Sequence, residues 1–135
     1  MELGQDSIAI VDFDEAIKLD PGYIRAICNR AEAKSKLNNN KGAQSDFEMA
    51  IKIKPEDVYI YQVRAGVSEQ LGKYKAAIGD YTRAITLSPQ DPDIYYNRGL
   101  AYQQLKMRSK FCEDMAHAVA LGHQNAQREL KSECK

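Results

Sequence analysis

Cys112, His117 and His123 are the side chains whose chemistry would suit a nucleophile, a base or a metal ligand. Cys112 and His117 could pair as nucleophile and base, but five residues apart on one helix they point in different directions. The two histidines and this cysteine also lack the paired short spacing of a zinc site. We therefore expect no catalytic residue, no metal site and no cofactor.

Two other features fail as sites for chemistry. Five residues separate Gly66 from Gly72 where a phosphate-binding loop needs four, and no serine or threonine follows Lys73. The acidic residues are many, but the helical pattern places them toward solvent, without an apolar pocket to raise a pKa. We predict that the chain is not an enzyme.

Composition narrows the partners and the compartment. The 135 residues include 19 basic and 19 acidic ones, so no net charge attracts nucleic acid or an anionic membrane surface. No apolar segment approaches the roughly 20 residues that a membrane-spanning helix needs, so we expect no membrane insertion. Cys28, Cys112 and Cys134 are too few and too scattered for a disulfide framework. We expect three free thiols and a soluble, cytoplasmic protein.

The chain repeats itself at a fixed interval. Pro21, Pro55 and Pro89 are equally spaced, and each closes an apolar-periodic helix that ends in an Ala-Ile pair. Upstream of each proline an alanine precedes an aromatic residue by four positions, as Ala43 precedes Phe47. This spacing stacks a small residue against a large one on one helical face. Such a period predicts an array of stacked helices.

The repeat resembles the tetratricopeptide repeat, whose signature is an aromatic residue, Leu-Gly and then Tyr on the first helix, Ala-x3-Phe on the second, and a closing proline. The best copy has Tyr95, Gly99 and Tyr102 at three of the first-helix places. The last copy departs from the pattern at Phe111, Met115 and His123. The leucine of the signature is replaced throughout, by Arg30, Arg64 and Arg98.

The resemblance covers almost the entire chain. It implies an all-α fold, a right-handed α-solenoid of helix-turn-helix 34-residue repeats with a C-terminal capping helix. We expect a single domain made of a half repeat with the second helix only (1–21), repeats at 22–55 and 56–89, a divergent repeat at 90–123 and the capping helix at 124–135. The expected helices are 5–19, 23–37, 41–53, 57–71, 74–87, 91–105, 108–121 and 124–133. Asn38, Gly72 and Gly122 support the breaks, since these residue types adopt left-handed conformations after a helix.

Aspartates share the period of the three arginines. They recur on the second helices at Asp12, Asp46, Asp80 and Asp114. We predict a ladder of Arg–Asp pairs between helices, because recurrence of both partners needs a periodic cause. The alternative is that these charges are solvated and contribute under about 1 kcal/mol each.

The first segment aligns with only the second helix of a repeat. The partner first helix is missing, so we expect an exposed apolar strip that includes Ile10, Phe13 and Ile17. We favour a sequence cut from a longer array. The alternative is that the strip packs against a second copy, which would make the chain a homodimer.

First helices of the family line the concave face of a superhelix, and such faces bind segments of other proteins. The resemblance therefore implies a protein–protein interaction scaffold that binds a peptide or protein partner. Tyrosines beside amides and an arginine suit a peptide-contacting surface. By position, the concave face holds Arg25, Cys28, Asn29, Glu32, Tyr59, Gln62, Val63, Gly66, Asp93, Tyr96, Asn97, Leu100 and Gln104.

Some members of the family clamp the C-terminal carboxylate of chaperone tails with Lys, Asn and Arg side chains. The five corresponding places here are Cys28, Glu32, Val63, Asp93 and Asn97, none of which matches and two of which are acidic. We expect no chaperone-tail binding in this register. Two other functions stay open: homo-oligomerisation through the N-terminal helix, and a non-catalytic role within a larger multidomain enzyme.

Overall fold

The computed structural model describes residues 2–134, with side chains described from residue 4 onward. Within that range the chain is all helix and turn, as the period of the sequence predicts. The helices are α1 (Glu2–Leu19), α2 (Ile24–Lys36), α3 (Asn40–Ile53), α4 (Val58–Gln70), α5 (Tyr74–Leu87), α6 (Pro92–Gln104), α7 (Arg108–Ala120) and α8 (Gln124–Glu133). Every predicted helix is present, and the bounds differ only at the ends.

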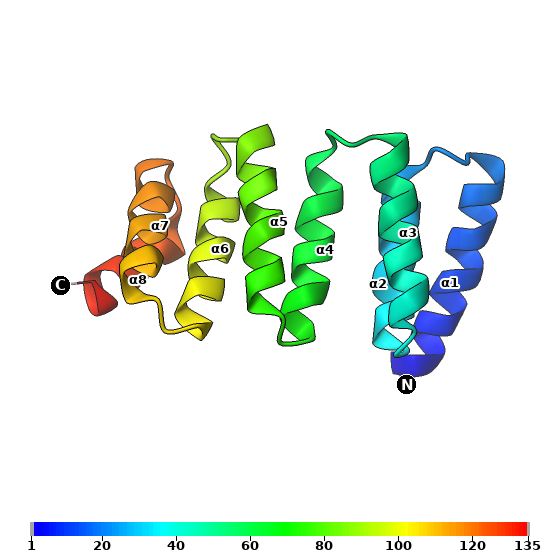
Figure 1. Cartoon of the computed structure of the whole chain (residues 1–135), viewed down its shortest axis with the longest axis horizontal. Coiled ribbons are helices and arrows are strands. Elements are labelled where there is room, and N and C mark those ends of the chain that lie inside the picture. Colours follow the sequence, from blue (N-terminus) through cyan, green and yellow to red (C-terminus); the bar gives the residue numbers. More distant parts are fainter. Residues whose placement is uncertain (1, 135) are drawn as a thin grey trace. The chain divides into compact units, whose positions relative to one another are not determined.

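The chain divides into two compact units, Met1–Val67 and Ser68–Lys135, and the division falls within α4. In the first unit α2 packs against both α1 and α3 (Figure 1). In the second unit α5, α6, α7 and α8 pack in chain order, each against the next. Helices close in sequence therefore make the core of each unit, as in a repeat architecture.

The turns that end the first helices follow the same period. Asn38, Gly72 and Lys106 are equally spaced along the chain and have φ values of 65°, 73° and 58°. Gly122, with φ of 96°, ends α7 in the same way. The predictions for Asn38, Gly72 and Gly122 are confirmed. Lys106 was not predicted, because lysine is not a residue type that favours this conformation.

Tyrosine hydroxyls tie the first helices to the closing prolines. The Tyr61 hydroxyl donates to the carbonyl of Pro55 at 2.7 Å, and the Tyr95 hydroxyl donates to that of Pro89 at 3.1 Å. The ring of each tyrosine is buried at the start of its helix. The aromatic place of the signature therefore both fills the core and satisfies a backbone carbonyl at the preceding turn.

Close helix packing explains the small residue of the signature. A Cβ at Gly99 would lie 2.5 Å from the Cε of Met115 and 3.1 Å from the Cβ of Asp114, on the facing helix α7. Ala31 occupies the same place on α2 and is fully buried. These positions need a small side chain because a second helix lies directly against them.

Candidate protein-binding surface

Two rungs of the predicted arginine–aspartate ladder are present. Arg30 donates from Nε and Nη2 to the carboxylate of Asp46 at 3.0 and 2.7 Å. Arg98 donates in the same bidentate way to Asp114 at 2.9 and 2.7 Å. These hydrogen bonds raise the pKa of both guanidinium groups. The rung between Arg64 and Asp80 would join the two units and stays a prediction.

Burial of the aspartates corrects the sequence interpretation. Asp46 and Asp114 are each 2% exposed, and Asp80 is also buried. The expectation that the acidic residues of the repeats point to solvent is wrong at these positions. A buried carboxylate is stable as an anion only with a closely paired cation, which the half-buried Arg30 and Arg98 provide.

We define the first-helix face as the accessible surface of α2, α4 and α6, the helices predicted to contact a partner. Cys28 does not belong to it: the side chain is fully buried, so its predicted contact with a partner is wrong. Burial, with Asp57 and Asp46 nearby, raises the pKa of its thiol to about 12. The exposed residues of the face are Arg25, Asp93 and Gln104. The half-buried ones are Asn29, Glu32, Tyr59, Gln62, Val63, Gly66, Tyr96, Asn97 and Leu100.

In the first unit the face is organised around Tyr59. The guanidinium carbon of Arg25 lies 4.4 Å from the centre of the Tyr59 ring, and the Tyr59 hydroxyl donates to Oδ1 of Asn29 at 2.6 Å. Partial burial is the main reason that the pKa of Tyr59 is raised, so the phenol is neutral and available as a donor. Half-buried Tyr59 therefore presents an aromatic surface that is already held in place.

In the second unit the face is organised around Tyr96. Its ring stacks on His123 with centroids 4.2 Å apart. Nδ1 of His123 accepts from the backbone N–H of Ala126 at 3.1 Å, and Nε2 lies 3.3 Å from Oδ1 of Asp93. Because Nδ1 accepts a hydrogen bond, the proton of this imidazole lies on Nε2, the ring nitrogen nearer to Asp93. His123, in the turn before α8, thereby fixes the position of the Tyr96 ring by stacking.

α8 adds a wall to the face that the sequence did not reveal. Tyr96 lines a hollow of about 620 Å³ together with residues of α8, namely Asn125, Arg128, Glu129, Lys131 and Ser132. Within this wall Arg128 Nη2 donates to Oδ1 of Asn125 at 2.6 Å. We predicted only a cap for this helix, since its apolar stripe is narrow. In chain order α8 comes after α7, where the first helix of a further repeat would come. Its polar sequence is the signal from which a surface role could have been expected.

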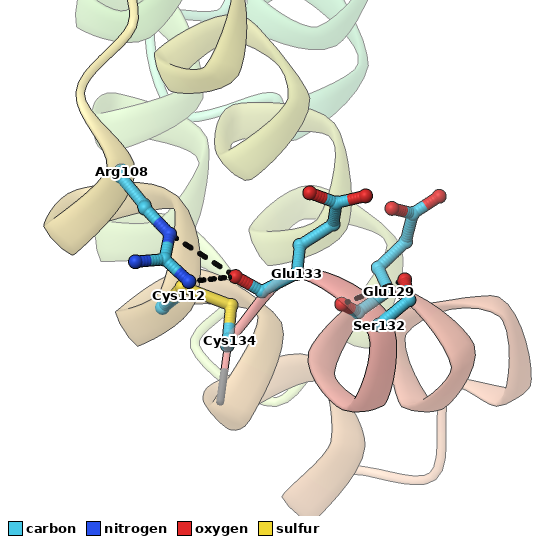
Figure 2. Close-up of a disulfide and its surroundings, with 6 residues drawn as sticks. All are labelled: Arg108, Cys112, Glu129, Ser132, Glu133 and Cys134. Atoms are coloured by element: carbon cyan, nitrogen blue, oxygen red, sulfur yellow. Dashed lines mark hydrogen bonds between the residues drawn. A yellow bond between two sulfur atoms is a disulfide. The ribbon is translucent and has the colours of Figure 1, made fainter.

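A disulfide joins Cys112 of α7 to Cys134, the residue after α8, so the prediction of three free thiols is wrong. Their Cα atoms are 5.7 Å apart, across 22 residues of sequence. Figure 2 shows Arg108 beside this bond, donating from Nε to the carbonyl of Glu133 at 3.1 Å. The two cysteines meet only because α8 folds back on α7, which the sequence spacing did not indicate. Cys28 is the free cysteine of the described chain.

The predicted apolar strip of α1 is also corrected. Ile10, Phe13 and Ile17 are half-buried, and α1 packs against α2. The exposed apolar side chains of the helix are Ile8, Val11 and Leu19, at 65%, 61% and 85%. The repeat alignment therefore located an incompletely covered helix but assigned the exposure to the wrong side chains.

Neither a metal site nor a membrane span is found in the part of the chain that the structure describes. No group of three or more His, Cys, Asp or Glu side chains there could hold a metal ion. No described helix has the length and apolar character to cross a membrane.

Solved structures with the same fold include several repeat proteins. PilF of Pseudomonas aeruginosa superposes with a TM-score of 0.78 and 20% identity, over 94% of this chain and 59% of that chain. A double mutant of MamA from RS-1 gives 0.75 and 22%, over 94% and 72%. The first TPR of Spaghetti (RPAP3), bound to an HSP90 peptide, gives 0.68 and 20%, over 80% and 87%. At these identities the likeness shows the fold.

Family profiles identify the repeat itself. The Tetratricopeptide repeat profile matches residues 24–57 and 92–121, and a profile described as TPR repeat matches residues 70–106. A search of curated protein sequences finds no significant match. The two profiles together account for most of the chain, and their matches include the residues that form the paired helices and the buried Arg–Asp pairs. The chain therefore belongs to the tetratricopeptide repeat family.

Proposed function

We propose that the chain is a scaffold that binds a peptide or protein segment of another protein on its first-helix face, extended at the C-terminal end by α8. The observation that carries this proposal is the hollow of about 620 Å³ beside Tyr96, walled by polar residues of α8. A half-buried aromatic ring next to hydrogen-bonding side chains is typical of the residues that dominate binding energy at protein interfaces.

Tyr59 gives the first unit a comparable feature. The ring is held by Arg25 on its face and by Asn29 at its hydroxyl, so little conformational freedom is lost when a partner covers it. Side chains fixed before binding favour affinity in this way. Each unit therefore offers one aromatic anchor with polar neighbours.

The ligand that we propose differs from the C-terminal carboxylates that some members of the family clamp. A tetratricopeptide domain of similar fold is solved with an HSP90 peptide. In this chain, however, Cys28 is buried at one clamp place, while Glu32 and Asp93 put acidic groups at two others. Asp93 is further engaged by His123. We propose an internal, uncharged peptide segment as the ligand, because a terminal carboxylate would meet like charges here.

Selection from a random peptide library on the immobilised chain would test the proposal. Peptides so obtained would be labelled, and their dissociation constants measured by fluorescence anisotropy. Tyr59→Ala or Tyr96→Ala is expected to weaken binding by about thirtyfold, corresponding to the roughly 2 kcal/mol of an anchor residue.

Tyr23→Ala is the matched control. Tyr23 is 46% exposed, precedes α2 as its N-cap residue and is not one of the residues assigned to the proposed face. This variant should bind the selected peptides like the wild type, and circular dichroism should show that all three variants are folded. Selected peptides whose affinity is unchanged by both Tyr59→Ala and Tyr96→Ala would contradict the proposal.

A further inference from the structure

α8 has little packing of its own to hold it in place. The helix buries only Ala126, with Leu130 half-buried, whereas α6 and α7 of the same unit each bury four residues. It has 10 residues, which is too short for a helix to be stable without contacts to the rest of the protein. The position of α8 therefore depends on what holds its two ends.

The C-terminal end of α8 is held by the disulfide. Cys134 directly follows the helix and is bonded to Cys112 of α7. Arg108, one turn before Cys112, donates from Nε and Nη2 to the carbonyl of Glu133 (Figure 2). Because Arg108 is exposed, water competes for these hydrogen bonds, and their net contribution is small. The covalent bond is therefore the main attachment of this end.

The disulfide can be reached from solvent. Cys112 and Cys134 are both half-buried, and together with Arg108 and Ser109 they line a hollow of about 430 Å³. A reducing thiolate needs such access to one of the two sulfur atoms, and exposed disulfides are the ones that are reduced readily. Arg108 also places a cation beside the bond (Figure 2), and a nearby cation stabilises the thiolate that leaves when the bond is broken. These surroundings suit a bond that is reduced and formed again.

The same helix walls the hollow beside Tyr96. Lys131 and Ser132 of that wall lie within one turn of Cys134. Tyr96 belongs to α6, which packs against α5 and α7. If the end of α8 leaves α7, the Tyr96 backbone stays in place while the wall residues move away with α8. The disulfide thus connects the redox state of the chain to the shape of the proposed binding site.

We propose that the Cys112–Cys134 bond is a regulatory site of thiol–disulfide exchange, through which a dithiol reductant weakens peptide binding beside Tyr96. Reduction frees the end of α8, and the hollow loses the wall that this helix provides. Such control rests on the function proposed for the hollow and adds the means by which that function is regulated.

The exchange proceeds in two steps. A thiolate of the dithiol attacks one sulfur of the bond, and the other cysteine leaves as a thiolate and takes up a proton. The second thiol of the reductant then loses its proton and displaces the first cysteine from the mixed disulfide. Two electrons and two protons have passed from the dithiol to the chain, which leaves two cysteine thiols and a disulfide within the reductant.

Dithiothreitol is the dithiol probe, and it is applied to the full chain without denaturant. Iodoacetamide labelling read by mass spectrometry should then find Cys112 and Cys134 modified and the buried Cys28 unmodified. Amide hydrogen exchange, measured without peptide, should rise at least about tenfold in α8 and stay within about twofold in α6, since only the helix that is released loses protection.

The second measurement concerns peptide binding. Its ligands are library-selected peptides that contain no cysteine and that Tyr96→Ala weakens. Anisotropy should show that dithiothreitol lowers their affinity at least about tenfold, since the contacts made by the α8 wall are lost. The matched control is the double variant Cys112→Ser with Cys134→Ser, which cannot form the bond. It should bind these peptides like the reduced chain and should not respond to dithiothreitol.

Three results would each overturn the proposed regulation and leave the proposed function intact: a bond that resists dithiothreitol unless urea is present, an α8 that keeps its protection after reduction, or Tyr96-dependent peptides that bind the reduced chain with unchanged affinity. Exchange that rises throughout α6 and α7 would also overturn it, because the unit would then unfold rather than release one helix. Failure of the proposed function looks different: peptides would bind the oxidised chain with no dependence on Tyr59 or Tyr96, and the regulation would fall with it.

Discussion

Arg30 and Arg98 each form an ion pair with a buried aspartate, at places that recur with the period of the repeat. Each replaces the leucine of the family signature and satisfies a carboxylate in the interior of a helix pair. The signature position is apolar because it faces the second helix. In this chain an aspartate lies opposite that position. The aliphatic part of the arginine can therefore fill the space of the leucine, while its guanidinium group pairs with the carboxylate.

Removal of one partner of such a pair should lower the stability of the folded chain. Arg98→Met is expected to lower the free energy of unfolding by about 3–5 kcal/mol, because Asp114 is left buried without a counterion. Urea denaturation followed by circular dichroism measures this loss. Arg128→Met, on exposed α8, should change it by less than about 0.5 kcal/mol. A double variant with Asp114→Leu should recover most of the stability, and a loss below about 1 kcal/mol for Arg98→Met alone would contradict a buried pair.

Cys28 should be chemically inert while the chain is folded. Its folded-state pKa of about 12 lies above the value of a free thiol, so the neutral form is the stable one. Stability associated with this group is complete below about pH 8.5 and falls as the pH rises toward 12. Iodoacetamide at pH 8 should leave Cys28 unlabelled in buffer and label it in urea, as read by mass spectrometry. Rapid labelling of the native protein would show that the thiol is accessible.

At the scale of elements, α8 depends on its disulfide. The helix buries only Ala126 fully, and its C-terminal end is held by the Cys112–Cys134 bond and by Arg108. A cross-link that closes a loop of this length contributes about 3 kcal/mol. Reduction with a dithiol, or Cys134→Ser, should therefore raise amide hydrogen exchange in α8 at least about tenfold while α2 and α3 are unchanged. Three titratable thiols in the unreduced, denatured protein would contradict the presence of this bond.

Helix positions and turns could be predicted from the sequence where neighbouring residues determine them. Contacts between residues far apart in the sequence could not. The period of Pro21, Pro55 and Pro89 located the helices, and Asn38 and Gly72 located their ends, because residue type alone limits these conformations. Lys106 has the same conformation without a favourable residue type. The periodic arginines and aspartates predicted two pairs correctly, but burial of the carboxylates depends on how closely the helices pack.

The surface that we propose for binding was less predictable than the helices, because it depends on how neighbouring helices contact each other. Alignment could assign Tyr59 and Tyr96 to first helices, but it could not show their ring contacts with Arg25 and His123. Cys28 was assigned to the surface although it is buried, because alignment gives the position on a helix but not the depth of the neighbouring side chains. The wall from α8 requires the chain to return past α6, and no spacing in the sequence specifies that return.

At the scale of the whole molecule, we propose that each of the two units contributes one aromatic anchor to partner binding. Tyr59 is the proposed anchor of the first unit, and Tyr96, beside α8, is that of the second. The chain has no net charge, so we expect recognition of a partner to depend on local groups rather than on a long-range field.

Mapping where a bound peptide lies is the most direct test of the central claim. A library-selected peptide that carries a benzophenone side chain would be bound to the full chain, irradiated and digested, and the cross-linked residues identified by mass spectrometry. We predict cross-links on α2, α4, α6 and α8, concentrated around Tyr59 and Tyr96. Cross-links concentrated on the solvent sides of α3, α5 and α7 would contradict the claim that the first-helix face binds the partner.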